Sequence, residues 1–584
     1  MNFKSDEPRE WSRRDEWSRR DEWSRRDEIL LAALAAIVWA WPFLSHLNWW
    51  GVRDWELFTA MAEIPRALIL SFQQFPFWNP YVGGGNILFH HPEVGVLSPT
   101  GLPALAFGAV IGLKLQVLIC YFIGFWGTER FGRTLGMSSL GAALFAVVYF
   151  GGSHFALHIA EGHIPFTQFC FLPWIAYFLC DTSSGKRGIL GAGIALALMI
   201  LGNGAAVPLL YTSCALGLWA LCEGARARTF GPIVRFSAAW GIGIGLAAVK
   251  FLPMLVYLAQ NPWQGAVTDY TPLWALGDVF FGLDQALFSH EGVGLPGRWH
   301  EFGAYISPIA VLLAGYAIIR HKRERWPWIV VAGFFLLFGL GDFGPWSPWR
   351  ILGHLPGFDS LRASGRAFQF VTLAVGVLAG FGLDALSFRL ANARAHAMLA
   401  PALVIIITVV NLWISHQSLT QSFVRPPERI AQAGEFVQRA GDPMRLYAAV
   451  RENTGTLRAP WLSAYHDARG LVTAEGTVLS EYILSGTATI ISRQYRGNEI
   501  DYIIEASSSG EIVLGMGFDQ GWRSVAPDGI ALREEQGLIA VPFGVGRQEI
   551  HLRYRTPFVG IGAVISALTA VACVVFTRRP RRKA

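Results

Sequence analysis

The chain has 584 residues, of which 53% are hydrophobic and only 15% are charged, and its mean hydropathy is positive. This composition excludes an ordinary soluble globular protein and indicates an integral membrane protein. The formal net charge of +6 comes from basic residues in short loops, so it indicates orientation in a membrane and not affinity for nucleic acid.

Residues 1–28 are predicted to form a cytoplasmic tail. Three tandem copies of the hexapeptide EWSRRD fill residues 10–27 of this tail. Successive tryptophans of the repeat, six residues apart, are rotated by about 240° around a helix axis, so they do not form one helical face. A repeat expansion is the simplest interpretation, and an anchor of Trp and Arg at the membrane surface is the alternative.

Twelve apolar segments are candidates for membrane-spanning helices, which need about 20 apolar residues each. The first segment follows Arg25 and Arg26 and lacks a small-residue cleavage site, which favours a retained helix over a signal peptide. The segments are 29–47, 110–128, 137–151, 164–181, 188–202, 206–222, 234–258, 303–319, 327–341, 367–387, 397–416 and 557–577. Several are short, and the pair around Gly202–Gly204 resembles a re-entrant hairpin, so a count two higher or lower also fits.

The positions of Lys and Arg predict how these helices are threaded through the plasma membrane. With the N-terminus inside, every predicted cytoplasmic loop is basic, and so is the C-terminal tail. The positive-inside rule therefore places both termini in the cytoplasm. The predicted external segments are 47–109, 152–163, 259–302, 342–366 and 417–556. The multi-helix membrane domain covers residues 29–416.

The external segment 417–556 is predicted to be a separate β-rich domain. A short helix is expected near Glu428–Ala440. Strands are expected where polar and apolar residues alternate, at Arg445–Val450, Thr487–Tyr495, Glu499–Glu505, Glu511–Met516, Leu538–Pro542 and Glu549–Tyr554. A turn at Ser508–Gly510 separates two of these strands. A small β-sandwich fits this pattern, and residues 557–584 then form a terminal membrane helix with a basic cytoplasmic tail.

Two acids follow the first predicted helix at its outer end. Asp54 and Glu56 lie where a carboxylate costs far less free energy than in the bilayer interior. They can cap the helix end in water, or one of them can be a general base that takes a proton from an acceptor hydroxyl. Asp54 is the first candidate for this base and Glu56 the second.

The same external segment continues as FPFWNPYVGGGNILFHHPEVGVLSP, residues 75–99. Trp78 and Tyr81 are candidates for stacking on a sugar, or for packing in a tight turn. His91 and Glu93 belong to a polar cluster that, with Asp54, has the donor types for a divalent cation. The alternative is a structural role in which the histidines bond to loop carbonyls. The glycines at 83–85 do not form a phosphate loop, because no Lys-Ser/Thr follows them.

Two further external segments carry candidate binding residues. Glu161 and His163 can form a second wall of the same site, or belong to a solvated loop at the membrane surface. Arg362 and Arg366 precede a predicted helix, where guanidinium groups and the helix dipole favour phosphate oxygens. Contact with lipid headgroups is the alternative for these arginines.

Four stretches of the sequence carry a resemblance to a known family. They are Asp54 with FPFWNPYVGGGN, the loop GGSHFALHIAEGHI leading into FLPW, residues 355–386, and the C-terminal GFDQGWRSVAPDG with LIAVPFGVGRQEIHLRYRTP. Together they resemble the YfhO-type bacterial membrane proteins, a branch of the GT-C glycosyltransferase superfamily. The resemblance covers most of the chain, and residues 355–386 are its most specific part.

The resemblance implies a GT-C-like membrane fold and transfer of a sugar from a polyprenyl-phosphate carrier to a cell-envelope acceptor outside the membrane. It implies that the first external acid, Asp54 with Glu56 adjacent, is the catalytic base or a metal partner. Arg362 or Arg366 would then steady the departing phosphate. A divalent cation is the cofactor that these residues could bind, and the expected partners are the lipid-linked sugar, the acceptor and the bilayer.

Two non-enzymatic functions remain as alternatives: a flippase for a lipid-linked sugar and a glycan-binding scaffold. A flippase is expected to show inverted repeats and interrupted helix pairs in corresponding halves. The sequence shows no such symmetry, and its acids gather on one predicted face. The pattern therefore favours the transferase.

Overall fold

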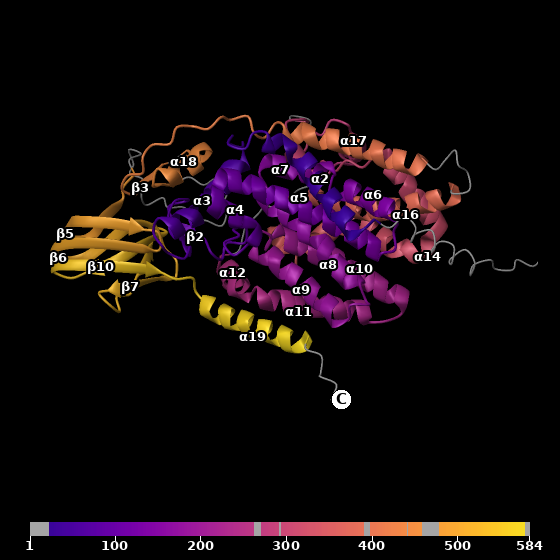
Figure 1. Ribbon diagram of the computed structural model, residues 1–584. Coiled ribbons are helices and arrows are strands. Elements are labelled where there is room, and N and C mark those ends of the chain that lie inside the picture. Colours follow the sequence, from indigo (N-terminus) through magenta and orange to yellow (C-terminus); the bar gives the residue numbers. More distant parts are fainter. Residues whose placement is uncertain are drawn as a thin grey trace, which may run out of the picture.

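The computed structural model describes residues 23–261, 270–290, 294–390, 398–440, 442–457 and 478–577. A body of packed helices occupies most of the molecule, and a β-sheet stands at one end of it (Figure 1). The tandem repeat up to residue 22 and the basic tail 578–584 lie outside the described residues. The chain is a multi-pass membrane protein with a C-terminal β-rich domain.

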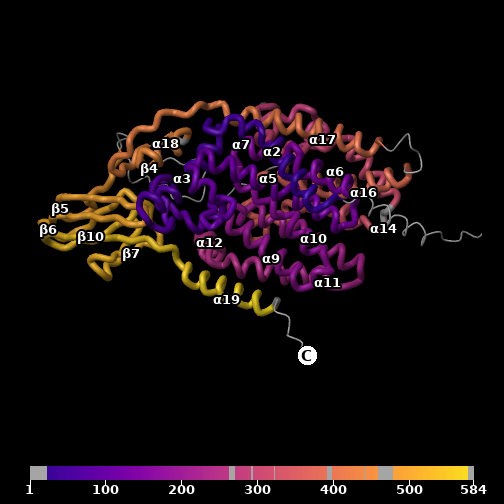
Figure 2. Tube along the Cα trace, viewed as in Figure 1, coloured from indigo at the N-terminus to yellow at the C-terminus, as the bar shows by residue number. Residues whose placement is uncertain are grey.

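The helical body is built from apolar helices of 9 to 32 residues. They are α2 (Arg25–Leu44), α5 (Ala109–Thr134), α6 (Ser139–Tyr149), α7 (Ser153–Glu161), α8 (Leu172–Cys180), α9 (Lys186–Leu201), α10 (Val207–Ala227), α11 (Gly231–Leu246), α12 (Ala248–Gln260), α14 (Pro308–Gly339), α16 (Phe368–Leu390), α17 (Leu399–Leu419) and α19 (Val559–Thr577). The terminal helix α19 lies beside α11 and α12, where Val249 N donates to Ser566 Oγ at 3.0 Å (Figure 2).

The predicted count of twelve spans is not confirmed. Within the described ranges, seven helices are long and apolar enough to cross a membrane, or eight if the pair α11 and α12, bent by 89°, is one span. Each of the twelve predicted segments overlaps a helix, but 303–319 and 327–341 both fall in α14. The predicted loop 152–163 is largely helical, because α7 continues the span that α6 begins.

The predicted loop 47–109 contains two helices that sequence reasoning missed. They are α3 (Asp54–Leu70) and the short α4 (Leu102–Phe107), and α3 begins at the candidate base Asp54. Polar residues such as Glu56, Glu63 and Arg66 made this segment too polar for a span, yet it is amphipathic enough for a helix at a domain boundary. The strap between α3 and α4 carries the small ladder of β1 (Trp78–Asn79) and β2 (Asn86–Ile87).

The C-terminal domain holds one six-stranded sheet instead of the predicted sandwich. Its strands are β5 (Glu481–Arg496), β6 (Glu499–Gly517), β7 (Trp522–Ala526), β8 (Arg533–Glu535), β9 (Leu538–Phe543) and β10 (Gly546–Tyr554). The order is β7-β10-β6-β9-β8, and β5 pairs antiparallel along β6. The predicted turn at 508–510 is interior to β6, whose first part pairs with β10 and whose second part pairs with β9.

The segment after α17 also departs from prediction. The helix expected at 428–440 is absent, and β3 (Val437–Arg439) pairs there with β4 (Thr454–Thr456). The strand expected at 445–450 is instead helix α18 (Leu446–Arg451), which packs on α3. Its alternating pattern was short enough to fit either structure, so tertiary contacts decided it.

The sheet buries its inner face against segment 57–94 and α18, which replace the second sheet of a sandwich. Trp78 is 1% exposed, and its ring lies 5.4 Å from the Trp522 ring and 4.6 Å from the Tyr554 ring. Its Nε1 also contacts Met516 Sδ at 3.1 Å. The β-rich domain is therefore packed onto the segment that contains Asp54.

Candidate functional site

A cavity of about 90 Å³ gathers residues from five separate segments of the chain. It is lined by Asp54, Leu57, Phe58, Glu93, His163, Pro165, Phe166, Ala206, Val207, Leu210, Ser360, Leu361, Arg362 and Arg366. Five of the ten predicted site residues are therefore brought together: Asp54, Glu93, His163, Arg362 and Arg366. This set is called the Asp54 cavity below.

Asp54 and His163 meet because a glycine lets two chain segments approach closely. Gly162 ends α7 in the left-handed region, with φ of 101°. A Cβ atom there would lie 2.2 Å from the Trp55 backbone nitrogen, so a side chain would push the segment off the start of α3. In this arrangement His163 Nε2 lies 3.1 Å from Asp54 Oδ2.

Pairing lowers the pKa of Asp54 and raises the pKa of His163, so that each partner favours its charged form. Burial acts to raise the Asp54 pKa, but the hydrogen bond from His163 and the charges of His163 and His300 outweigh it, so that pKa is lowered. For His163, burial acts to lower the pKa, and the hydrogen bond and charge of Asp54 outweigh it, so that pKa is raised. Asp54 is therefore held as a carboxylate at neutral pH.

Glu93 presents its carboxylate to the same cavity. No described residue forms a hydrogen bond or an ion pair with this carboxylate. Burial raises its pKa, and the Asp54 charge adds to this, against the charges of His163, Arg366 and Arg362. The backbone is fixed instead: Asn203 Nδ2 donates to Glu93 O at 2.9 Å, and Lys250 Nζ donates to Val94 O at 2.7 Å.

A cluster of ion pairs adjoins the cavity and is connected to it through Arg366. Glu161 accepts from Arg53 at 2.7 Å and from Arg298 at 3.0 Å, and it lies outside the cavity wall. The other carboxylate, Glu301, accepts two hydrogen bonds of 2.5 Å from Arg366. His300 lies between them, with ring nitrogens 3.4 Å from Glu161 and 3.3 Å from Glu301.

The structure offers one three-residue group with metal-binding donor types among the described residues. The donor atoms of His163, His300 and Glu301 lie within 4.8 Å of one another. Both Glu301 oxygens, however, are occupied by Arg366, and the two nitrogens of His163 face Asp54 Oδ2 and His158 Nδ1, the latter at 2.8 Å.

A cation at Glu301 would also lie near the Arg366 guanidinium. Two positive unit charges about 4 Å apart repel by about 4 kcal/mol in surroundings of intermediate polarity, and a divalent ion roughly doubles that. The residues therefore do not fit a divalent cation while Arg366 is bound to Glu301.

Three predicted site residues do not line the Asp54 cavity. Glu56 is 3% exposed and faces the β-rich domain, where it accepts from Tyr447 N at 2.8 Å and pairs with Arg425 at 3.2 Å. Trp78 and Tyr81 are 1% and 3% exposed and belong to the core beneath the sheet. They do not line the cavity, because the β-rich domain covers their rings.

His91 also has a structural position. Its Nδ1 accepts from Glu93 N at 3.2 Å, and burial together with the charge of Lys250 lowers its pKa to about 3. This neutral imidazole has a structural position within the loop, but it accepts from a backbone N–H, whereas the alternative above expected a bond to a loop carbonyl. His91 thus shapes the strap that carries Glu93 but does not line the Asp54 cavity.

Several residues of the cavity and of the neighbouring ion-pair cluster escaped sequence reasoning. Phe58 and Phe166 supply the aromatic lining that had been assigned to Trp78 and Tyr81. His300 and Glu301 lie in a predicted external loop, and the polar run Arg298–Glu301 was the signal that could have marked them. Nothing in the local sequence distinguishes Phe58 and Phe166 from other core phenylalanines.

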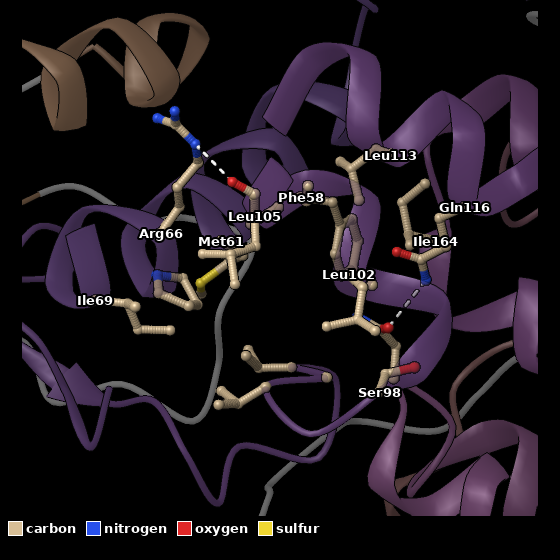
Figure 3. A pocket seen from close by; sticks show the side chains of 18 residues that line it. Phe58, Met61, Arg66, Ile69, Ser98, Leu102, Leu105, Leu113, Gln116 and Ile164 are labelled. Atoms are coloured by element: carbon tan, nitrogen blue, oxygen red, sulfur yellow. Dashed lines mark hydrogen bonds between the residues drawn. The ribbon is translucent and has the colours of Figure 1, made fainter. Parts of the chain in front are cut away.

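A second cavity, of about 80 Å³, runs along α3 and shares Phe58 with the first (Figure 3). Met61, Ile69 and Leu102 contribute to its largely apolar wall. Arg66 Nε donates to Leu105 O at 3.3 Å, and Gln116 Nε2 donates to Asn203 Oδ1 at 3.2 Å. Leu102 is 60% exposed, so the outer edge of this cavity is apolar.

No model of a known protein family matches the sequence, and no curated protein matches it. Three solved structures are similar in fold. Arabinofuranosyltransferase AftD from Mycobacteria has 17% identity and a TM-score of 0.48, over 76% of this chain and 31% of that chain. ArnT from Cupriavidus metallidurans, bound to undecaprenyl phosphate, has 13% identity and a TM-score of 0.42, over 89% of this chain and 98% of that chain.

The third is the Archaeoglobus fulgidus oligosaccharyltransferase, with 11% identity and a TM-score of 0.39, over 74% of this chain and 64% of that chain. All three are GT-C glycosyltransferases. The chain spans about a third of the length of AftD and about two thirds of the oligosaccharyltransferase. These likenesses concern the fold alone.

Proposed function

We propose that this protein is a membrane glycosyltransferase of the GT-C superfamily, of the YfhO type, that transfers a sugar from a polyprenyl-phosphate carrier to an acceptor hydroxyl of the cell envelope. The observation that carries the proposal is the Asp54 cavity. It combines an ionised carboxylate, a second carboxylate that has no hydrogen-bond or ion-pair partner among the described residues, and two arginines around one space. Such a transfer requires a base for the acceptor hydroxyl and positively charged groups for the departing phosphate.

The geometry supports a single inverting displacement. Asp54 takes the proton of the acceptor hydroxyl while the acceptor oxygen forms the new bond to the sugar. The bond from the sugar to the phosphate breaks, and its electron pair leaves with the lipid phosphate. Arg362, which is exposed and lines the cavity, and Arg366 bind the oxygens of that phosphate.

The second cavity supports a lipid-linked substrate. Phe58 lines both cavities, so we expect a molecule with a polar head at Asp54 to extend an apolar chain past this ring and along α3. Burial of apolar chain there contributes about 0.8 kcal/mol per CH₂ group. Phe58 and Phe166 replace Trp78 and Tyr81 as candidates for contact with the sugar.

The distribution of basic residues supports an external site. From the positive-inside pattern we expect Asp54 on the outer face of the plasma membrane and both termini in the cytoplasm. A cell-envelope acceptor and a lipid carrier that presents its sugar outward would meet on that face.

The test compares two variants on the same helix. In lipid nanodiscs with a labelled polyprenyl-phosphate sugar and cell-envelope acceptors, Asp54→Asn should lower transfer by about 10²- to 10⁴-fold, the usual contribution of a general base. Glu56→Gln, two residues further along α3 but facing the β-rich domain, should retain transfer. A thermal unfolding curve for each variant controls for folding.

Wild-type turnover by folded Asp54→Asn would remove Asp54 from the mechanism. A flipping assay with the same labelled lipid distinguishes the transport alternative. A protein that moves the lipid between leaflets and transfers no sugar to any acceptor would contradict the proposal.

A further inference from the structure

Arg366 occupies the position that a metal ion would need beside the Asp54 cavity. Its Nε and one terminal nitrogen each donate to a different oxygen of Glu301, at 2.5 Å. This bidentate contact uses both oxygens of Glu301, which is the only carboxylate in the donor group of His163, His300 and Glu301. An arginine that lines the cavity therefore stands where a cation would have to bind.

The backbone next to Arg366 approaches the backbone of Glu301 closely. A Cβ atom at Gly365 would lie 2.4 Å from the carbonyl oxygen of Glu301, so only glycine lets the two segments come this close. The Arg366 side chain is 15% exposed, and its guanidinium lies 5.4 Å from the centre of the Phe166 ring. The contact is therefore held by packing on two sides.

The two carboxylates next to the cavity lining are already paired with arginines. Glu161 is paired with Arg53 and Arg298, and Glu301 with Arg366. A divalent cation has its usual role where carboxylates gather without such partners. Two of the five N–H groups of Arg366 are used by Glu301, which leaves three for an anion in the cavity.

We infer that the transfer proposed above needs no divalent cation, and that Arg366 is the residue that excludes one by occupying Glu301 and directing its remaining donors to the leaving phosphate. The inference rests on the proposed function for the identity of the reaction. It concerns a different property, which is the source of positive charge at the cavity. The displacement changes no oxidation state, and the leaving phosphate oxygen needs only a positive charge beside it. An arginine can supply that charge as well as a metal ion can.

The first test uses the wild-type protein purified in nanodiscs. Transfer should proceed at the same rate after treatment with EDTA and with 1,10-phenanthroline as in added Mg²⁺ or Mn²⁺. Elemental analysis should find less than one equivalent of bound metal. Loss of transfer in a chelator with recovery on adding a divalent ion, or one equivalent of copurified metal, would overturn the inference.

The second test asks whether Arg366 is the residue responsible. Arg366→Gln frees Glu301 beside His300 and His163, so Zn²⁺ or Mn²⁺ should raise the unfolding temperature of this variant and not that of the wild type. The double variant Arg366→Gln/Glu301→Gln is the matched control and should lose the metal-dependent rise. A folded Arg366→Gln that gains no stability from either metal would contradict the role given to Arg366.

These readouts separate the two proposals. Thermal unfolding with metal and elemental analysis need no turnover, so they report on Arg366 even if no sugar transfer is found. Absence of transfer under every condition would count against the glycosyltransferase alone. If Arg366→Gln fails to fold, the chelator and metal-content measurements on the wild type still decide the inference.

Discussion

Glu56 is expected to make the stability of the protein depend on pH between about 4.5 and about 7. Its carboxyl is 3% exposed between α3 and the β-rich domain. Burial, with a smaller effect of Glu428, raises its pKa from 4.5 to about 7, against the opposing effects of the Tyr447 N–H and Arg425. The folded protein therefore keeps the proton on Glu56 over a range in which the unfolded chain releases it.

The sign and size of the effect follow from this difference. A raised pKa in the folded state contributes stability that is fully present below pH 4.5 and is lost as pH rises through about 7. At about 1.4 kcal/mol per pKa unit, the interval from 4.5 to about 7 corresponds to a loss of about 3 kcal/mol. Glu56→Gln keeps an oxygen for the Tyr447 N–H but cannot ionise, so it should remove this loss.

The measurement is thermal unfolding in nanodiscs at pH values from 4.5 to 8, with the wild type and Glu56→Gln side by side. The unfolding temperature of the variant should gain on that of the wild type as pH rises, with most of the gain complete by about pH 7.5. Glu435→Gln, an exposed residue of the same domain, is the control and should follow the wild type. Parallel profiles for Glu56→Gln and the wild type, or a difference that is largest at low pH, would refute the reasoning.

Two further changes test how the site is supported. Trp78→Ala removes a buried ring packed on Trp522 and Tyr554 and should lower the free energy of unfolding by about 3–5 kcal/mol. The unfolding temperature should fall, and proteolysis should release the β-rich domain faster. Resistance to proteolysis equal to that of the wild type would contradict the packing described. Lys250→Met removes the donor to the carbonyls of residues 94, 200 and 202, each of which costs about 1–3 kcal/mol when buried without a partner. Unfolding temperature and sugar transfer should both fall, because the strap that carries Glu93 loses its anchor, and a stable, active variant would exclude that role.

The sequence was sufficient for features that depend on composition and local pattern. Runs of apolar residues must be shielded from water or lie in lipid, so each predicted span overlaps a helix. Strands such as β9 and β10 were found because a half-buried strand alternates polar and apolar residues. Asp54, Glu93, His163, Arg362 and Arg366 were singled out because charged groups beside membrane helices are rare.

Other features were decided by contacts between distant segments. The strand predicted at 445–450 is helix α18, because packing on α3 outweighs a short alternating pattern. Glu56 and Asp54 are two residues apart, and the sequence made both of them candidates for the base. On a helix they are rotated by about 200°, so one faces the cavity and the other faces Tyr447.

The sequence alone thus determined that the chain lies in a membrane, that its long apolar segments contain helices, and which ionisable residues stand outside the apolar runs. Only the tertiary structure decided which of those residues share a cavity, and that Trp78 and Tyr81 belong to a domain interface. It also showed that Glu301 is bound by Arg366, 65 residues away in the chain. The physical reason is that burial, ion pairing and shifted pKa values depend on distance in space, and spacing along the chain does not fix that distance.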